Sequence, residues 1–459
     1  MSSPRLSDLP VILWLRQDLR LADNPALAAA VATGRPVIPL FILHQASDGR
    51  DWGAASLWWL DKSLRSLDAD LRSRGSRLIL RRGDPAMILP ALAQELRAQL
   101  FWNRLYGQSA VGRDSDLKAE FGAISCNGSL LVEPWAVKTG TGGTYQMFTP
   151  FWKAAQGVIE DTVVHRAPEQ IPAPDQWPDS DPIDDWTLQP SKPDWSKDFE
   201  GTPGEAGAHA ALTQFIRAHL DDYPRGRDRP DIAGTSRLSA HLHWGEIGPR
   251  QIRAAIEKAG GPAAAKFMAE LGWREFNHHL LYQHGALYER NIRRDFDRFQ
   301  WRHDPEGLQA WKEGRTGYPM VDAGMRQLWT TGFMHNRVRM VVASFLIKHL
   351  LIDWREGEAW FWDTLVDADE ANNPANWQWS SGSGADAAPF FRIFNPVAQG
   401  ERFDPHGEYV RRWIPELAHL PAKTIHQPGQ GVEGYPGPIV DHAMARQRAL
   451  AAFKAMRAD

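Results

Sequence analysis

The sequence predicts a protein in two parts, an α/β unit at the amino end and a mainly α-helical unit at the carboxy end. Short apolar runs alternate with amphipathic stretches from Val11 to about Glu133, which is typical of a parallel sheet with crossover helices. After Gly207 the apolar residues repeat at helical spacing as far as Leu417, which favours helices. These two observations together indicate the fold class.

The first strands are predicted at four apolar runs, VILWL at 11–15, VIPLFIL at 37–43, RLIL at 77–80 and AQLFWN at 98–103. A helix is expected after the first run, because Asn24 is a good N-cap and Pro25 suits the first helical position. A second, amphipathic helix is expected from Ala54 to Arg74, with Gly75 as its stop. The pattern indicates a Rossmann-like parallel sheet.

A long connector is expected between the two units. Residues 138 to 207 are rich in Pro, Asp and Gly, with PEQIPAPDQWPDSDP at their centre, and they show little periodicity. We therefore divide the chain into an α/β domain at 9–135, a surface connector at 136–206 and a helical domain at 207–459. In the helical domain the clearest helical segments are 212–220, 262–285 and 337–354.

Composition limits the class of protein. The chain has 459 residues, 43% hydrophobic and 24% charged, as expected for a globular protein of two or three domains. Its one cysteine, Cys126, excludes a disulfide framework and a cysteine-ligated iron–sulfur cluster within one chain, and it fits a reducing compartment. We see no secretory signal and no apolar run as long as a membrane span. We expect a cytoplasmic protein that does not contact membranes.

Arginines cluster in two places although the net charge is −4. The clusters consist of Arg225, Arg227 and Arg229, and of Arg290, Arg293, Arg294, Arg298 and Arg302. Two interpretations are open, namely solvated faces balanced by nearby acids, or a cleft that binds phosphates.

A group of hydroxyls precedes a predicted helix in the helical half. After Tyr223, the run GTSRLSAHLHWGEIGPRQ offers Thr235, Ser236 and Ser239, with the charge of Arg237 among them. Hydroxyls and free N–H groups at a helix N-terminus suit a pyrophosphate. On these residues alone, N-capping by Ser or Thr is the simpler explanation.

Two stripes of polar and aromatic residues lie on predicted helices. Glu270, Trp273 and Asn277 fall at i, i+3 and i+7 and share one face, and Asn336 and Met340 share another. A carboxylate, an indole and an amide on one face can pair with and stack on a planar heterocycle. The alternative for each stripe is a core face with an interhelical hydrogen bond.

Carboxylates and amides are also concentrated in VDADEANNPANWQW, where Asp367, Asp369 and Asn373 precede Trp377 and Trp379. Two such carboxylates could bind a divalent metal, but the sequence supplies no further ligand pattern, so we expect no metal. We prefer pairing with arginine and hydrogen bonding to a cofactor edge. The whole segment 316–379 has the length of a buried helical core yet is rich in polar and aromatic residues, which indicates a large bound organic molecule.

Together these motifs resemble the photolyase and cryptochrome flavoproteins, and most of all the bacterial cyclobutane pyrimidine dimer photolyases. The resemblance is carried by WLRQDLRLADNPAL, by the hydroxyl-rich run, and by WREF, TGYP.VDA.MRQL, MHNR.RM, ASFL, IDWREGE, NWQW and FRIFNP. It covers nearly the whole chain. It implies an α/β antenna domain, an all-α domain that holds FAD in a U-shaped conformation, and a monomer that acts on UV-damaged DNA.

By position, the resemblance puts flavin contacts on Tyr223, Thr235, Ser236, Arg237, Leu238, Ser239, Arg339, Asp367, Asp369 and Asn373. Within this set, Asn373 matches the residue that faces flavin N5, and Arg339 matches the partner of Asp367. A neutral amide at that place favours reduced flavin, because it can hydrogen-bond the reduced form without delivering a proton readily.

The resemblance also implies a lesion-binding face. Asn336 and Met340 match enzymes that act on cyclobutane dimers, whereas animal-type enzymes for the (6-4) photoproduct carry His at both places. Glu270 would hydrogen-bond the flipped bases, and Trp273 and Trp379 would pack against the apolar side of the dimer. The DNA-contacting positions are matched by Arg227, Arg274, Asn277 and Arg337. We take Glu270, Asn336, Met340 and Asn373 as the catalytic residues.

The implied reaction is driven by light. Excited reduced FAD gives one electron to the dimer, the two ring bonds split, and the electron returns to the flavin. The dimer leaves the DNA helix first, since photolyases act on flipped-out nucleotides. Trp377, Trp354 and Trp301 match the chain of indoles that re-reduces oxidised flavin from the protein surface.

The sequence leaves the antenna chromophore open. Folate-binding relatives often carry an acidic residue in the loop that reads YGQSAVGRD here, but Gly107 to Ala110 offer no carboxylate. Trp58 and Trp59 resemble a subgroup that stacks a folate near this helix. Methenyltetrahydrofolate, 8-hydroxy-5-deazaflavin and no chromophore all stay open, in that order of preference.

Other functions compete with dimer repair. Asn336, Met340 and Asn373, and the lack of a long polar tail after the helical domain, disfavour a cryptochrome-like blue-light photoreceptor. A photolyase for (6-4) photoproducts would carry different residues at 336 and 340. An electron-transfer flavoprotein would not need the stripe of Glu270 and Trp273.

Overall fold

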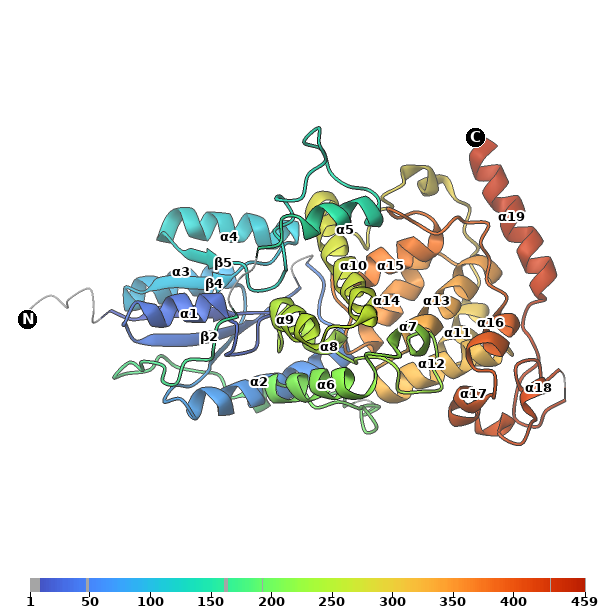
Figure 1. The fold of residues 1–459 in the computed structure, drawn as a ribbon, viewed down its shortest axis with the longest axis horizontal. Helices are drawn as coiled ribbons and strands as arrows, with labels where there is room; N and C mark the ends of the chain where they lie inside the picture. The colour runs from blue at the N-terminus through green and yellow to red at the C-terminus, as the bar shows by residue number, and fades with distance from the viewer. Residues whose placement is uncertain (1–8, 47–48, 161–163, 192, 430, 459) are drawn as a thin grey trace, which may run out of the picture.

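The computed structural model describes residues 9–46, 49–160, 164–191, 193–429 and 431–458, and it confirms the predicted fold class. An α/β unit stands at one end of the molecule and a helical unit at the other (Figure 1). The last helix, α19 (His442–Ala458), lies at the end of the molecule opposite the sheet.

The sheet is parallel throughout and, in the described part of the chain, has five strands. They are β1 (Val11–Leu15), β2 (Val37–Leu43), β3 (Ile79–Arg82), β4 (Gln99–Asn103) and β5 (Ile124–Cys126), in the order β3-β2-β1-β4-β5. The four predicted strands are confirmed, and the short β5 is additional. The order reverses between β1 and β4, so their carboxyl ends form the topological switch point of the sheet.

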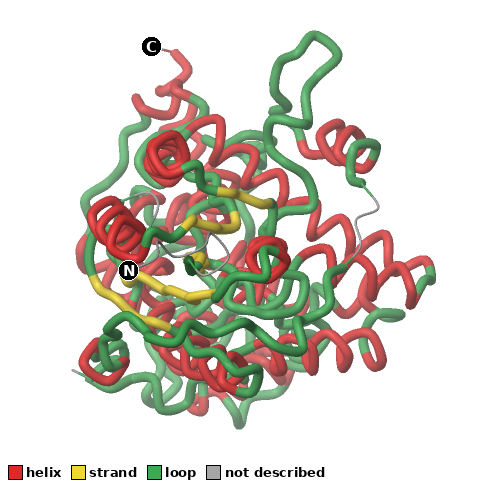
Figure 2. Tube along the Cα trace, turned by 90° about the vertical axis from the view of Figure 1, so that its left-hand side faces the viewer, coloured by secondary structure: helices red, strands yellow, loops and turns green. Residues whose placement is uncertain are grey.

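Helices cover both faces of this sheet, as Figure 2 shows from the α/β end. Val11 and Leu13 pack with α1 (Pro25–Ala32) and α2 (Ala54–Arg72), whereas Ile12 and Trp14 pack with α3 (Pro85–Leu96) and α4 (Gln108–Phe121). Since successive residues of a strand point to opposite faces, a strand buried on both sides is apolar throughout.

The predicted start of α1 is confirmed. Asn24 accepts a hydrogen bond from the Leu27 amide at 3.0 Å, and Pro25 occupies the first helical position. The α2 helix ends at Arg72, and Gly75 follows with a φ of 79°, in the left-handed region that glycine adopts easily.

The segment between the two units is more ordered than the sequence predicted. It contains α5 (Phe148–Gln156), whose buried Phe151 packs on Phe276 of the helical unit. Ile171 and Trp186 are buried in the core that α1 and α2 share with the sheet. These parts of the expected surface connector are therefore helical or buried, and the domain boundaries stay a prediction. Isolated aromatic residues among Pro and Asp carry no periodic signal.

The helical unit consists of α6 (Glu205–Ala218), α7 (Tyr223–Gly226), α8 (Ser239–His243), α9 (Pro249–Ala259), α10 (Pro262–His284), α11 (Pro305–Lys312), α12 (Pro319–Thr331), α13 (Asn336–Ser344), α14 (Trp354–Thr364), α15 (Asn372–Ser381), α16 (Pro396–Phe403), α17 (Glu408–Trp413), α18 (Ala422–Ile425) and α19. The single helix predicted over 337–354 is wrong in its second half. After α13, a π-helical turn occupies Phe345–His349, and α14 begins at Trp354. Asp353 starts the new helix by accepting from the Arg355 amide at 3.0 Å.

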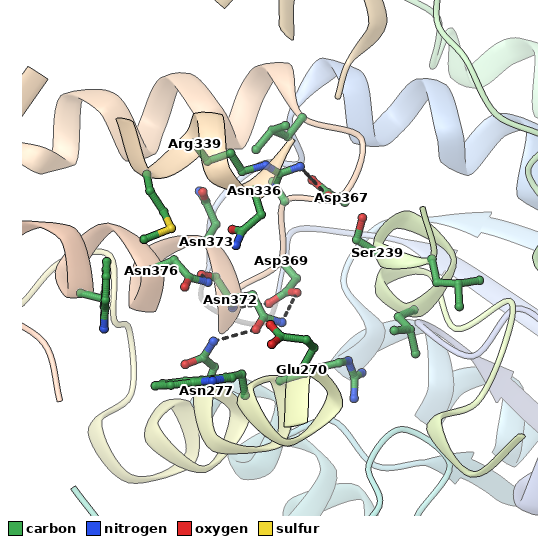
Figure 3. Close-up of a pocket in the computed structure, with 18 of the residues that line it drawn as sticks. Ser239, Glu270, Asn277, Asn336, Arg339, Asp367, Asp369, Asn372, Asn373 and Asn376 are labelled. Atoms are coloured by element: carbon green, nitrogen blue, oxygen red, sulfur yellow. Dashed lines mark hydrogen bonds and ion pairs between the residues drawn. The ribbon is translucent and has the colours of Figure 1, made fainter. Parts of the chain in front are cut away.

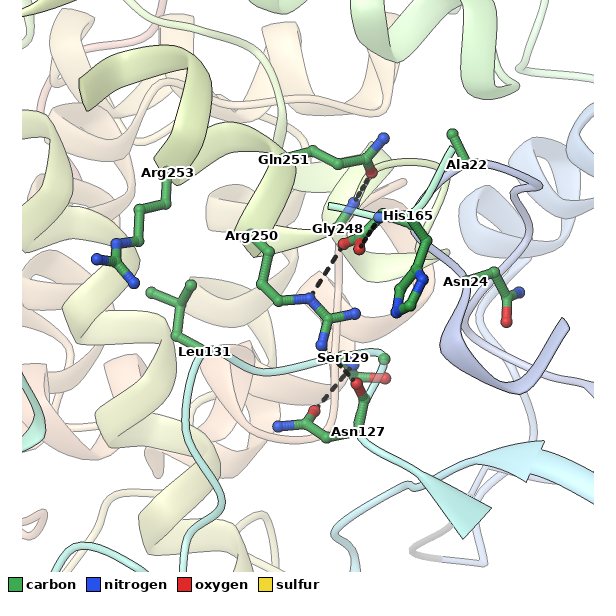
Figure 4. A network of polar contacts seen from close by, with 12 residues as sticks. Ala22, Asn24, Asn127, Ser129, Leu131, His165, Gly248, Arg250, Gln251 and Arg253 are labelled. Atoms are coloured by element: carbon green, nitrogen blue, oxygen red, sulfur yellow. Dashed lines mark hydrogen bonds and ion pairs between the residues drawn. The ribbon is translucent and has the colours of Figure 1, made fainter. Parts of the chain in front are cut away.

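Buried polar contacts join the two units. The guanidinium of Arg20 donates to the carbonyls of Gly245 and Gly128, at 2.8 and 2.7 Å. Arg250, on α9, donates to Asp23 at 3.2 Å and to the carbonyl of Asn127 at 2.9 Å (Figure 4). Because buried charges are costly when unpaired, these contacts hold the units in one relative position.

A carboxylate of α10 also lies in this interface. Glu275 accepts from the backbone amides of Leu131 and Val132, at 2.9 and 3.2 Å. Burial raises the pKa of this carboxyl from 4.5 to about 7, and Arg274 opposes the shift.

Glu275 should make stability depend on pH. Its folded-state pKa lies above the unfolded value, so its contribution to the free energy of unfolding is full below pH 4.5 and is lost as the pH rises through about 7. This change in pKa corresponds to at most about 3 kcal/mol of the free energy of unfolding. Urea unfolding at a series of pH values from about 5 to 8 measures this slope.

In Glu275→Gln the free energy of unfolding should depend less steeply on pH, because the amide does not titrate. Glu120→Gln, at an exposed position of α4, is the matched control and should keep it. A Glu275→Gln variant with the slope of the unmodified protein would contradict this origin of the pH dependence.

Candidate functional site

A cavity of about 440 Å³ opens in the helical unit, within the size range of cofactor sites. Its walls come from α8, α10, α13 and α15 and from the loop between α14 and α15 (Figure 3). The predicted site residues that line it are Tyr223, Arg227, Ser236, Leu238, Ser239, Glu270, Trp273, Arg274, Asn277, Asn336, Arg339, Met340, Asp367, Asp369, Asn373, Trp377 and Trp379. The structure thus brings the separate sequence motifs together around one space.

Other predicted site residues do not line this cavity, namely Thr235, Arg237, Arg337, Trp301 and Trp354. Arg237 pairs with Glu200 at 3.1 Å, and Arg337 pairs with Asp228 at 2.8 Å. The roles assigned to these five residues, in binding flavin, in binding DNA or in electron transfer, stay predictions.

The hydroxyl side chains near the start of α8 do not cap this helix. Leu238 is the N-cap residue and makes no side-chain capping bond, and Ser236 accepts a bond of 3.4 Å from the Leu238 amide. Ser236 and Ser239 line the cavity, where a polar ligand can meet them. Burial and the charge of Glu270 raise the pKa of the Tyr223 phenol above its usual value, so Tyr223 keeps its proton and can donate it.

An ion pair closes the buried end of the cavity. One nitrogen of Arg339 lies 3.0 and 2.8 Å from the two carboxylate oxygens of Asp367, and Arg339 also donates to the carbonyl of Met334 at 2.7 Å. The Asp367 side chain is 2% exposed. A carboxylate buried to this degree requires its cation, so the pair fixes the loop before α15 against α13.

Asp369 is oriented by donors at the start of α15. It accepts from the backbone amides of Ala371 and Asn372 at 2.8 and 2.5 Å, and from the Asn372 side chain at 2.6 Å. Asn277 of α10 donates to Asn372 at 2.8 Å (Figure 3). Sequence reasoning missed Asn372, although it stands beside Asn373 in VDADEANNPANWQW.

Asn373 is held by a residue that sequence reasoning also missed. Its amide nitrogen donates to the backbone carbonyl of Glu358 at 3.1 Å and to the Glu358 carboxylate at 2.9 Å. Glu358 lies on α14 and is buried. The available signal was an acid close to the aromatic run at the end of WREGEAWFW.

The open end of the cavity has a different character. Glu270 pairs with Arg227, and Lys266 lies 3.7 Å from the same carboxylate. Trp273 stacks on Phe148 of α5 at 3.9 Å between ring centroids. Asn336 and Met340 line the cavity from α13. Polar and aromatic walls of this kind suit a flat polar molecule with an apolar face.

The three predicted electron-transfer indoles differ in their exposure to solvent. Trp377 lines the cavity, Trp354 is fully buried and donates to Asn291 at 3.0 Å, and Trp301 is partly buried. Trp377 packs against Gly357, one helical turn after Trp354 on α14. The arrangement is compatible with a path from the cavity outward, and the path itself stays a prediction.

The switch point of the sheet is filled by side chains. Arg16 pairs with Asp114 through contacts of 2.8 and 3.1 Å, and its guanidinium lies 4.4 Å from the Trp14 ring. Trp59 is buried against His241, and Trp58 against Phe199. Neither indole presents an open face to a chromophore. The YGQSAVGRD stretch is helical from Gln108, at the start of α4.

No group of three or more His, Cys, Asp or Glu side chains within the described ranges is placed to hold a metal ion. Among those residues, too, no helix combines the length and the apolar character that crossing a membrane requires.

Comparison with known proteins relates both halves to one family. Residues 11–175 match a family model described as DNA photolyase, and residues 267–455 match one described as the FAD binding domain of DNA photolyase. A deoxyribodipyrimidine photo-lyase of Agrobacterium fabrum is 49% identical, over 98% of this chain and 99% of the relative. Cryptochrome-1 of Arabidopsis thaliana is 38% identical, over 95% of this chain and 69% of the relative.

A solved structure shows the same similarity in three dimensions. The crystal structure of a bacterial class III photolyase from Agrobacterium tumefaciens aligns with a TM-score of 0.95 at 48% identity, covering 100% of this chain and 99% of that one.

The packing around Trp377 yields a prediction about Gly357. A Cβ at this position would lie 2.1 Å from the Trp377 ring, whereas a Cβ at Gly112, inside α4, would meet nothing within 4 Å. Replacing a helical glycine by alanine usually stabilises a protein by about 0.5–1 kcal/mol. We expect Gly112→Ala to raise the free energy of unfolding by that amount. Gly357→Ala should lower it by about 1–3 kcal/mol, because the Trp377 indole must move.

Chemical unfolding of the two variants checks this expectation. Equal stabilisation by both substitutions would contradict the close packing of Trp377 on α14.

Proposed function

The chain belongs to the DNA photolyase family, and from this premise we propose that it repairs cyclobutane pyrimidine dimers in DNA, using light absorbed by reduced FAD. It is an enzyme, a carbon–carbon lyase. The observation that carries the proposal is the two-ended cavity. Its buried end presents Asp367 and Asn373, and its open end presents Glu270 and Trp273 opposite Met340.

The residues of the buried end fit FAD. Asp367 and Asp369 are fixed acceptors for N–H and O–H groups, because Arg339 and the α15 amides hold their carboxylates in place. The hydroxyls of Tyr223, Ser236 and Ser239 suit a sugar or a pyrophosphate. When bound in its reduced form, FAD supplies an electron on absorbing light and takes it back after the ring bonds have split.

The open end fits two adjacent bases. Glu270, 28% exposed beside Arg227, can hydrogen-bond the polar edges of flipped bases. Trp273 and Met340 offer apolar contact to the saturated ring carbons. A damaged and poorly stacked pair costs only about a few kcal/mol to flip out, which contributes to selectivity.

The type of lesion is proposed from two residues on α13. Asn336 and Met340 line the cavity, and the family resemblance implies that a (6-4) photolyase would carry histidines at both positions. Neither side chain can serve as a proton donor in the way that a histidine can. The reaction proposed for cyclobutane dimers requires no such donor, because it moves only an electron.

DNA would contact the rim through its phosphates. Arg227 and Arg274 line the cavity. Arg293, in the second arginine cluster, is exposed and donates to the carbonyl of Gly382, directly after α15. Phe391, in the same loop region, is 62% exposed. Contacts of this kind bind without sequence readout, so affinity should fall steeply with salt.

We further propose that Trp377, Trp354 and Trp301 carry electrons to oxidised flavin. The position of Trp377 in the cavity wall and the burial of Trp354 support this. For the antenna, methenyltetrahydrofolate, 8-hydroxy-5-deazaflavin and no chromophore all stay open. Arg16 and Asp114 pair at the switch point where a second flavin-like molecule would be sought, and the burial of Trp58 and Trp59 disfavours a folate stacked on them.

A blue-light photoreceptor is the second candidate function, since the chain also resembles a plant cryptochrome. Glu270 and Trp273 at the open end, with Met340 opposite them, favour repair, because a sensor needs no lesion-binding face.

We propose a monomer acting in the cytoplasm, in keeping with the single cysteine.

Illumination of the reduced protein with dimer-containing oligothymidylate tests the proposed function. We expect the absorbance of intact thymine to recover in light and not in the dark. A second arm with (6-4) products should show no recovery. Recovery in that arm alone would overturn the proposed lesion, and recovery in neither arm would overturn the enzymatic function.

Substitution of Trp377 separates repair from flavin reduction. Trp377→Phe should leave repair by pre-reduced protein nearly unchanged and should nearly abolish light-driven reduction of oxidised flavin, followed by visible absorbance. Trp177→Phe is the control, because Trp177 packs with the α/β core. Photoreduction at the normal rate in Trp377→Phe would refute the proposed path.

A further inference from the structure

A loop of the α/β unit reaches the helix that supports the flavin site. Residues 49–53, between β2 and α2, lie against α14: the Trp362 indole donates to the carbonyl of Asp51 at 2.8 Å, and the Ala54 amide donates to Asp363 at 3.0 Å. A Cβ on Gly53 would lie 1.9 Å from the Trp362 carbonyl oxygen, so only glycine permits this approach. The loop is therefore docked closely on the helical unit.

Arg50 projects from this loop onto Glu358. One guanidinium nitrogen lies 3.0 and 2.9 Å from the two carboxylate oxygens, and the side chains are 15% and 3% exposed. The guanidinium also lies 3.8 Å from the ring centroids of both Tyr288 and Trp362. Two rings and a carboxylate leave this cation little freedom, as expected for a planar group that is stacked and paired.

Glu358 in turn fixes the amide of Asn373. The Asn373 nitrogen has two hydrogens, and it donates to the Glu358 carbonyl at 3.1 Å and to the Glu358 carboxylate at 2.9 Å. Both contacts require a donor, since a carbonyl and an ionised carboxylate only accept. The amide oxygen is the polar atom that Asn373 has left for the cavity that it lines.

We propose that Arg50 is a positioning residue of the flavin site: it holds the Glu358 carboxylate in place, and that carboxylate turns the oxygen of the Asn373 amide toward the flavin. The inference rests on the proposed function, in which FAD occupies the buried end. An acceptor at this place suits reduced flavin, which presents an N–H group at N5. The α/β unit thereby adjusts the chemistry of a cofactor held by the helical unit.

The charges make the proposal testable. Arg50 and Glu358 together are neutral, and reduced flavin is an anion. Removing the cation leaves a buried negative charge near the flavin and disfavours the reduced form. Removing the carboxylate leaves a buried positive charge and favours it. Removing both restores neutrality.

The experiment measures the two-electron midpoint potential of bound FAD in the purified holoprotein. Arg50→Gln should shift the ratio of reduced to oxidised flavin by about tenfold toward oxidised, a lowering of about 30 mV. Glu358→Gln should raise the potential by a similar amount, and the double variant should lie near the unmodified protein. Arg50→Lys, which keeps the charge but not the paired geometry, should give a smaller shift of the same sign as Arg50→Gln.

Arg250→Gln is the matched control. Arg250 also pairs across the two units, with Asp23, and is 13% exposed, but it does not line the cavity. The Arg250→Gln variant should have a lower melting temperature and an unchanged flavin potential. If Arg50 had a purely structural role, Arg50→Gln would also lower the melting temperature and leave the potential unchanged.

The outcomes separate this inference from the proposed function. If the unmodified protein binds FAD and repairs dimers but the Arg50 and Glu358 variants share its potential, the inference fails alone. It also fails if Arg250→Gln moves the potential as far as Arg50→Gln does. An unmodified protein that binds no flavin would overturn the proposed function and this inference with it.

Discussion

Buried carboxylates and the partners that they require organise the site. Asp367 is held by Arg339, and Glu358 by Arg50, with exposures of 2% and 3% for the two acids. Because an unpaired buried charge costs several kcal/mol, α13, α14 and the loop before α2 are constrained to an arrangement that brings these partners together. The cavity is the space that this arrangement leaves, and its polar lining follows from the same requirement.

This constraint also explains how far the sequence could predict the structure. Strands and helix starts were predictable because their signals are local, as at Asn24 before Pro25. For the cavity, local patterns offered only parts such as the stripe that contains Glu270, and the full set of residues came from the family resemblance. The Arg50–Glu358 pair was not predictable, since its members are 308 residues apart and no local pattern links Arg50 to the IDWREGE motif in which Glu358 stands. The break after Ser344 was missed because the apolar residues keep helical spacing, although Asp353 offered a capping signal.

The fold alone does not decide between a repair enzyme and a photoreceptor, since the chain resembles members of both groups. The difference lies in the side chains at the open end of the cavity. Glu270 and Trp273 on α10 and Asn336 and Met340 on α13 line the space that we propose the bases enter. At the buried end, the proposed orientation of Asn373 would favour a reduced cofactor. In this proposal, substrate recognition and cofactor state are set by different walls of one cavity.

The most direct test of this account is a crystal structure of the protein with FAD and a DNA duplex that contains one cyclobutane dimer. The account predicts that the dimer lies outside the helix, between Glu270 with Trp273 and Met340, and that the flavin ring lies between the dimer and Asn373. A dimer that remains stacked in the duplex, or a flavin bound away from Asp367 and Asn373, would contradict it.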